Sequence, residues 1–284
     1  MSGPKRSVAA TGDGSNRESR MPSGRVRIAG TVIVIALALL VAGGTWYALT
    51  QRSPSTQTVV LDLQHDGGER PKAVIVDQLS DRSPDQPFVD ASTARLRDAG
   101  YDVDYVTAEQ VTVDFYRTLP QRGYRMILLR SHSARRVVEN EKTDSATLFT
   151  TEPASLDQHR DELTARRLGF VQYDDGPGDR YFGVRPEFIE QDMQGEFDSR
   201  AVVVLMGCDG LRSDRLAKAF VRRGAQSFIS WDEPVTATQT DRATSELIDR
   251  LLQPSATLAD AVAATMREVG PDAQTGAKLA YYPR

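Results

Sequence analysis

Cys208 is the only cysteine in this chain of 284 residues, and its surroundings favour a reactive thiol. It follows the apolar run 201–206 (Ala-Val-Val-Val-Leu-Met), which is typical of a buried strand, and it lies between Gly207 and Gly210. A tight turn at these glycines would let backbone N–H groups face a developing oxyanion. The alternative is a buried structural thiol, because free cysteine is among the residue types most often found in cores.

His132 is the candidate partner of this thiol. It comes just after a second apolar run, 126–129 (Met-Ile-Leu-Leu), whereas His65 and His159 follow no strand-like run. A nearby imidazole can generate a thiolate and later protonate a leaving amine. Open α/β sheets build their sites at the carboxyl ends of strands. The two positions therefore predict a His132/Cys208 dyad, and the alternative for His132 is a solvated loop histidine.

The order of these residues along the chain narrows the class of cysteine enzyme. All three histidines precede Cys208. Papain-like peptidases and class I glutamine amidotransferases place the histidine after the cysteine, so both are excluded. A histidine after one strand followed by a cysteine after a later one is similar to the caspase–gingipain–separase clan and to the related CHAT domains.

Two stretches carry this resemblance. Residues 206–210 (Met-Gly-Cys-Asp-Gly) resemble the caspase signature in their Cys-x-Gly. Residues 216–232 resemble the CHAT and separase pattern, in which a helix and a Gly-Ala turn lead into a strand that ends in a tryptophan. Two departures are visible: the clan usually has His-Gly where this chain has His132-Ser133, and alanine usually occupies the position of Gly207.

The resemblance implies a fold and an activity. The fold would be an α/β, caspase-like three-layer sandwich with a mainly parallel sheet, and the N-terminal residues described below predict one transmembrane helix before it. The activity would be that of a cysteine endopeptidase, with His132 as base and then acid and Cys208 as nucleophile. The backbone amides of Ser133 and Cys208 would form the oxyanion hole. Acyl transfer of this kind needs no metal or organic cofactor.

The resemblance also implies a substrate specificity. In separase-like relatives an acidic residue after the tryptophan reads a basic P1 side chain, which implies Trp231 and Asp232 as substrate-binding residues. A carboxylate pairs well with the arginine fork. The alternative is an ordinary loop aspartate, since Asp-Glu-Pro at 232–234 is also a good turn sequence.

The N-terminal residues predict a membrane anchor. Residues 1–27 are rich in Gly, Ser and Arg and should form a disordered cytoplasmic tail, whereas 28–49 are uncharged and long enough to span a hydrocarbon core of about 30 Å. The excess of Lys and Arg before this span places the N-terminus in the cytoplasm. Residues 50–70 would form a stalk, and 71–284 an extracytoplasmic domain. A cleaved signal peptide is the alternative, but no A-x-A site follows the apolar segment.

Composition limits the partners. A net charge of -4 and a pI near 5.5 argue against nucleic acid as a partner. The resemblance implies a protein or peptide substrate, and the oligomeric state stays open. The main rival is a non-catalytic caspase-like sensor or protein-interaction domain, because an external thiol is prone to oxidation unless it is buried and inert. A flavodoxin-like protein would need a glycine-rich loop after the first strand, where residues 80–85 are Ser-Asp-Arg-Ser-Pro-Asp.

Strand and helix patterns alternate from Lys72 onward, which predicts a mainly parallel sheet covered on both faces. The expected strands are 73–76, 101–106, 126–129, 201–206 and 227–230, with a hairpin strand at 147–150. The expected helices are 88–99, 109–119, 156–168, 214–223, 241–252 and 258–269.

Overall fold

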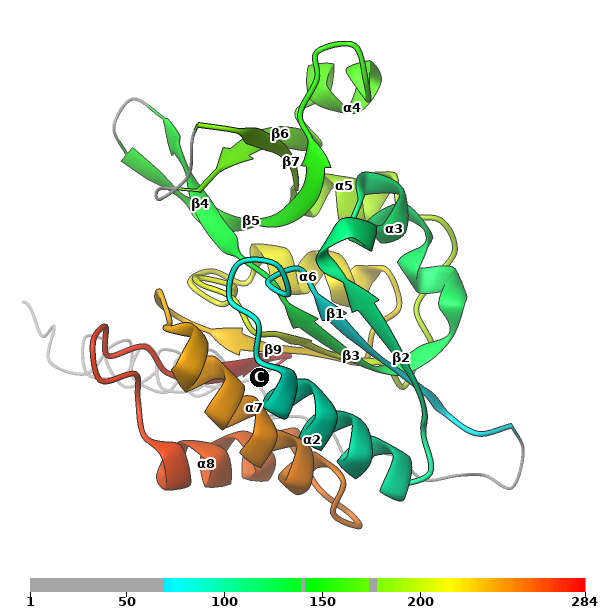
Figure 1. Ribbon diagram of the computed structural model, residues 1–284, viewed down its shortest axis with the longest axis vertical. Coiled ribbons are helices and arrows are strands. Elements are labelled where there is room, and N and C mark those ends of the chain that lie inside the picture. The colour runs from blue at the N-terminus through cyan, green and yellow to red at the C-terminus, as the bar shows by residue number, and fades with distance from the viewer. Residues whose placement is uncertain (1–68, 139–140, 174–177, 284) are drawn as a thin grey trace, which may run out of the picture. The chain divides into compact units, whose positions relative to one another are not determined.

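The computed structural model describes residues 69–138, 141–173 and 178–283 (Figure 1). The chain divides into two compact units, 1–55 and 56–284, and every described residue belongs to the second. The tail at 1–27, the anchor at 28–49 and nearly all of the stalk at 50–70 lie outside the described residues. Within the described part, no helix is both long and apolar enough to cross a membrane.

A six-stranded sheet forms the centre of the domain, in the order β10-β9-β8-β3-β1-β2. Its strands are β1 (Lys72–Asp77), β2 (Asp102–Thr107), β3 (Tyr124–Arg130), β8 (Val202–Leu205), β9 (Ser227–Trp231) and β10 (Leu279–Tyr282). All neighbouring pairs are parallel except β10 with β9, which is antiparallel. The mainly parallel α/β sheet predicted from the sequence is confirmed, and β10 is an edge strand that the sequence pattern did not reveal.

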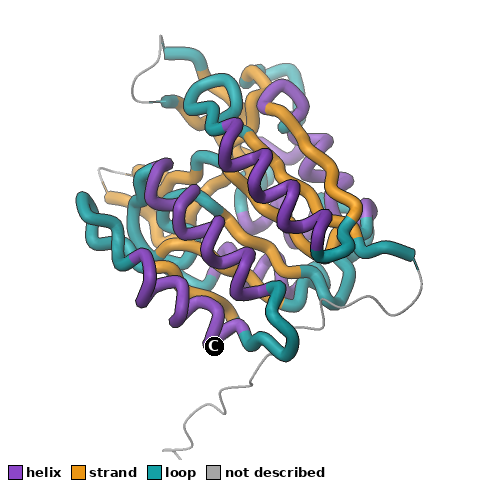
Figure 2. Tube along the Cα trace, turned by 60° about the horizontal axis from the view of Figure 1, so that its bottom comes forward, coloured by secondary structure: helices purple, strands orange, loops and turns teal. Residues whose placement is uncertain are grey.

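Helices cover both faces of this sheet, as its continuous apolar strands require. On one face lie α2 (Gln86–Asp98), α7 (Ala237–Leu251) and α8 (Leu258–Val269), whose apolar residues share a core with β1, β3, β8 and β9. Figure 2 shows these helices packed beside one another. On the other face lie α3 (Val113–Thr118), α5 (Pro186–Gln191) and α6 (Arg215–Arg222).

A second, antiparallel sheet of four strands rises from the carboxyl end of the large one, in the order β4-β5-β7-β6 (Figure 1). Its strands are β4 (Ser133–Val138), β5 (Glu141–Pro153), β6 (Leu168–Gln172) and β7 (Arg180–Val184). The predicted hairpin strand at 147–150 belongs to β5, but the rest of the sheet was not foreseen. It matters for the site because β4 starts directly after His132.

Two predicted helices are wrong. The span 109–119 is broken into short 3₁₀ turns at Ala108–Gln110 and Leu119–Arg122 around α3, which begins after Thr112 because the Thr112 hydroxyl accepts a hydrogen bond from the Phe115 N–H. The span 156–168 contains only α4 (Arg160–Thr164), since Leu168 already belongs to β6. The remaining predicted helices and strands agree with the structure to within a few residues at their ends.

Candidate active site

The candidate residues follow adjacent strands of the large sheet. Asp232 follows β9, Cys208 comes three residues after β8, and His132 comes two residues after β3. Since β9, β8 and β3 are neighbours in the sheet and run parallel, their carboxyl ends meet along one edge. The Met206 N–H donates to the Leu129 carbonyl at 2.8 Å, which continues the pairing of β8 with β3 up to the site.

The segments that carry His132 and Cys208 are in direct contact. The Ser133 hydroxyl donates a hydrogen bond of 2.6 Å to the Cys208 carbonyl. A Cβ atom placed on Gly207 would lie 2.4 Å from the Ser131 carbonyl oxygen and 2.5 Å from the Ser133 Oγ, closer than real Cβ contacts come. The side chain of Ser133 therefore occupies the space that a residue larger than glycine would need at 207.

His132 is exposed to solvent, but two aromatic rings pack against its imidazole ring. Its ring packs edge-on against Tyr173, with centroids 5.0 Å apart, and at 5.7 Å from the ring of Phe149. The backbone N–H of His132 donates to the Gln78 Oε1 at 3.0 Å, and the Gln78 Nε2 donates to the Tyr173 hydroxyl. The sequence analysis missed Gln78 and Tyr173. Gln78 directly follows β1, so the same strand-end rule could have identified it.

The Cys208 thiol is partly exposed and contacts the backbone of Val235. The Val235 N–H donates to Sγ at 3.4 Å, and Sγ lies 3.6 Å from the Val235 carbonyl oxygen. The next residue, Thr236, caps α7 by accepting a hydrogen bond from the Gln239 N–H. The thiol therefore lies beside the N-terminus of a 15-residue helix.

Asp272 holds the start of α7 in place. Its carboxylate accepts hydrogen bonds from the Thr236 N–H and hydroxyl at 2.9 and 2.8 Å, and from the N–H groups of Gln274 and Thr275. Burial alone would raise the pKa of Asp272, but these hydrogen bonds stabilise the carboxylate and lower its pKa to about 2.

The strand pairing gives the direction of the Ser133 N–H, one of the two predicted oxyanion donors. Ser133 pairs with Leu148 of β5, and the bond from the Phe149 N–H to the His132 carbonyl marks this as a non-hydrogen-bonded pair. In such a pair the N–H of Ser133 points away from β5. Beyond Cys208 the chain turns through Asp209 at φ +58, so the left-handed residue of the turn is an aspartate rather than one of the glycines.

A buried ionic cluster supports the strand that delivers His132. Arg130 is 1% exposed and binds Asp77 at 2.8 Å, Asp241 at 2.8 and 2.9 Å, and the Ser83 carbonyl. Burial would lower the pKa of Arg130, but its bonds to Asp241 and Asp77 outweigh that effect and raise it. The cluster ties β3 to β1 and α7, two residues before His132.

The two residues predicted to bind substrate have structural contacts. Trp231 is 0% exposed, and its indole N–H donates to the Thr240 hydroxyl at 2.9 Å, so its side chain belongs to the core and is not available to a substrate. The Trp231 side chain is buried because it packs on the face of the large sheet that α7 covers. Asp232 is partly exposed, and its Oδ1 accepts the Lys278 N–H at 2.7 Å, which extends the β9–β10 pairing.

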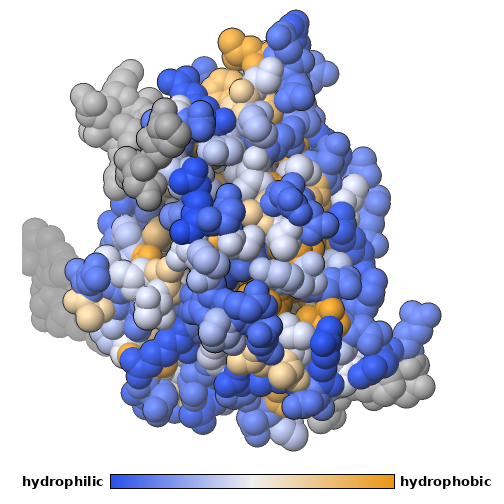
Figure 3. Space-filling view, in the orientation of Figure 1, coloured by the Kyte–Doolittle hydropathy of each residue, from blue (hydrophilic) through white to orange (hydrophobic). Residues whose placement is uncertain are grey.

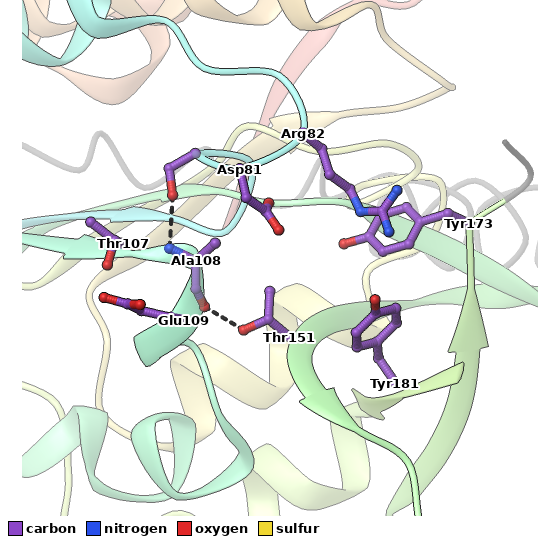
Figure 4. Close-up of a pocket in the computed structure, with 9 residues that line it drawn as sticks. Asp81, Arg82, Thr107, Ala108, Glu109, Thr151, Tyr173 and Tyr181 are labelled. Carbon is purple, nitrogen blue, oxygen red and sulfur yellow. Dashed lines mark hydrogen bonds between the residues drawn. The ribbon is translucent and has the colours of Figure 1, made fainter. Parts of the chain in front are cut away.

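A cavity of about 490 Å³ lies at the carboxyl ends of β1 and β2 (Figure 4). Tyr173 lines this cavity and also packs against His132. The guanidinium carbon of Arg82 lies 3.8 Å from the centroid of the Tyr173 ring. The other polar residues that line the cavity are Ser80, Asp81, Thr107, Glu109, Thr151 and Tyr181. Its position agrees with the rule that open α/β sheets bind ligands beyond the carboxyl ends of their strands.

A comparison of the chain with family models finds no match, and a comparison with curated proteins finds no significant match. The assignment of function therefore depends on the site itself.

Proposed function

We propose that this protein is a membrane-anchored cysteine endopeptidase of the caspase-like clan that uses His132 and Cys208. The observation that carries the proposal is the contact between the two segments: they follow adjacent parallel strands and are joined by the bond from the Ser133 hydroxyl to the Cys208 carbonyl. A histidine and a cysteine on separate loops need such a connection to stay within reach of each other.

The proposed reaction is acyl transfer. His132 takes the Sγ proton, and the thiolate attacks the scissile carbonyl carbon to give a tetrahedral oxyanion held by the Ser133 and Cys208 N–H groups. The C–N bond breaks, His132 protonates the leaving amine, and a thioester remains on Cys208. Water, deprotonated by His132, then attacks the thioester and releases the carboxylic acid and the thiol.

Preference for a basic P1 residue is the further part of the proposal. Asp232 stands at the end of β9, next to the Cys208 strand, and is partly exposed. The backbone N–H of Lys278 donates to its Oδ1, which fixes the position of the carboxylate without adding a counter-charge. A fixed carboxylate at this place can pair with an arginine or lysine side chain.

The location of the protein belongs to the same proposal. The uncharged run 28–49 and the basic residues that precede it support a single-pass anchor with the N-terminus in the cytoplasm and the domain outside.

The test is covalent labelling of the full chain, solubilised in mild detergent, with an arginine acyloxymethyl ketone probe. We expect wild type to be labelled, Cys208→Ala and His132→Ala to lose labelling, and Asp232→Asn to be labelled more slowly. His159→Gln is the matched control, because His159 bonds to Glu152 at 2.8 Å rather than to the dyad. Unlabelled wild type, with circular dichroism showing a folded chain, would disprove a peptidase that prefers a basic P1 residue.

A non-catalytic sensor or interaction domain is the second candidate. It is favoured by the structural use of Trp231 and Asp232, the two residues expected to read the substrate. However, hydrophobic side chains on the face in Figure 3 form small separate patches rather than a broad docking surface. A folded chain with no labelling and a thiol inert to iodoacetamide would favour this candidate.

A further inference from the structure

We propose that the peptide N–H of Val235 and the N-terminus of α7 stabilise the Cys208 thiolate, and that Asp272 is the positioning residue that keeps them beside the sulfur. This inference rests on the proposed function, in which the thiolate is the nucleophile. It concerns the state of the thiol before any substrate arrives, so it can be measured without peptidase activity.

The contact itself favours the anion. The Val235 N–H points at Sγ from 3.4 Å, and this bond becomes charge-assisted when the sulfur is deprotonated. The neutral thiol can instead donate to the Val235 carbonyl at 3.6 Å, but S–H is a weak donor. The bond that the thiolate strengthens is therefore worth more than the one that it loses.

The helix adds to the same effect. Val235 directly precedes Thr236, the N-cap of α7, so the sulfur lies next to the positive end of a 15-residue helix dipole. Cysteines at helix N-termini have a larger thiolate fraction than free cysteine at the same pH.

Asp272 makes this arrangement rigid. Its carboxylate lies 36 residues away along the chain and accepts both the N–H and the hydroxyl of Thr236, while remaining 2% exposed. The Gln239 side chain also donates to the Gly270 carbonyl at 2.9 Å, which joins the first turn of α7 to the same loop. Asp272 therefore holds the peptide group between Val235 and Thr236, directly next to the one whose N–H faces Sγ.

Other charged groups on the surrounding segments could change the titration of the thiol. His132 follows the adjacent strand, Asp209 forms an ion pair with Arg135 at 3.3 Å, and Glu233 pairs with Arg212. These groups are left intact in the variants below. Asp272→Asn also removes a negative charge near the thiol, which by itself would lower the midpoint, so a rise in that variant reports on the lost positioning of Val235.

The test measures the rate of alkylation by iodoacetamide against pH for the full chain in detergent. Because Cys208 is the only cysteine, all incorporated label reports on it. Val235→Pro removes the N–H and keeps the carbonyl, and Val235→Ala is its matched control, since it keeps both. We expect the midpoint of the alkylation curve to rise by about one pH unit in Val235→Pro, with about tenfold slower alkylation below both midpoints. Val235→Ala should stay near wild type.

Asp272→Asn provides a second, independent arm in case the proline disturbs folding. Its matched control is Asp260→Asn, which alters a carboxylate bonded to the N-cap Thr257 of α8, a different helix from the one that starts beside the thiol. We expect the midpoint to rise in Asp272→Asn and not in Asp260→Asn. A wild-type midpoint at the ordinary thiol value of about 8.5, or folded variants whose midpoints fall or stay unchanged, would overturn the inference. If the variants show the expected midpoint shifts but the wild-type chain is not labelled by the arginine probe, only the proposed peptidase activity is contradicted.

Discussion

Ser133 and Gly207 are in direct contact, and they are the two positions at which the sequence differs from the clan that it resembles. In that clan glycine usually follows the histidine and alanine usually precedes the cysteine, whereas this chain has a side chain at 133 and a glycine at 207. The Ser133 hydroxyl lies where a Cβ on residue 207 would be, within 2.5 Å. The pair therefore keeps the same space filled between the ends of β3 and β8.

The first prediction concerns this pair. Gly207→Ala should lower the free energy of unfolding by about 1–3 kcal/mol, because the added methyl group overpacks the site, and it should slow probe labelling. Adding Ser133→Gly should restore part of both losses, since one of the two contacts is removed; the contact with the Ser131 carbonyl remains. Urea unfolding of the two single variants and the double variant measures the coupling. Additive losses would show that the two residues do not share this space.

Arg130 gives a second prediction. Arg130→Met would leave the carboxylates of Asp77 and Asp241 buried without their cation, so the free energy of unfolding should fall by about 3–5 kcal/mol. Arg160→Met is the control, because its ion pair with Asp157 is exposed to solvent and should contribute about 0–1 kcal/mol. Similar urea midpoints for the two variants would contradict a structural role for the buried cluster.

At this scale the sequence predicted where two of the candidate residues lie in the fold. Cys208 and His132 could be placed because the end of an apolar run marks the end of a parallel strand. Val235 and Asp272 could not, since they reach the thiol through contacts spanning 27 and 36 residues that leave no local pattern. The prediction that Trp231 binds substrate was wrong, because a tryptophan at the end of a strand does not indicate on which face of the sheet its side chain packs.

Helix α7 is the element that connects the two halves of the candidate dyad. Its Asp241 binds Arg130, at the end of the strand that precedes His132, and the residue before its cap contacts the Cys208 sulfur. A shift of this helix would therefore move both reacting groups together.

Acid should loosen the start of α7, which is the third prediction. The pKa of Asp272 in the folded chain is about 2, below its ordinary value, so its carboxylate stabilises the fold above about pH 4. That contribution is lost as the pH falls from about 4 to 2. Urea unfolding at several pH values should show a steeper loss in this window for wild type than for Asp272→Asn. Parallel curves would show that the hydrogen bonds of Asp272 do not depend on its charge.

The elements of the large sheet were predicted well, and those of the small sheet were not. Strands β1, β3, β8 and β9 are buried on both sides, and their continuous apolar runs are easy to recognise. The small sheet contains β4, which reads Ser-Ala-Arg-Arg-Val-Val, and its strands pair only with one another. Such pairing is decided by tertiary contacts rather than by local alternation.

The whole molecule combines the described domain with N-terminal residues that carry the anchor prediction. A composition with a net charge of -4 and an uncharged run of 22 residues at 28–49 suits a polar domain held at a membrane surface. The α/β class followed from the sequence because strand and helix patterns alternate from Lys72 onward, where the first described strand begins.

Exposure of the domain to the outside is the fourth prediction. In intact cells that express the full chain, an added protease should degrade the domain while a cytoplasmic marker stays whole, because the basic residues before 28–49 keep the N-terminus inside. Permeabilised cells provide the control in which both proteins are cleaved. Protection of the domain until permeabilisation would reverse the proposed orientation.

The interlocking of residues 133 and 207 also restricts how such a site can change over generations. A lineage moving between Gly–Ala and Ser–Gly at these positions must pass through one of two intermediates. Ser–Ala places two groups in the same space, whereas Gly–Gly leaves that space empty. A small void is the milder defect, so the passable route is the one on which the side chain is lost at one position before it is gained at the other.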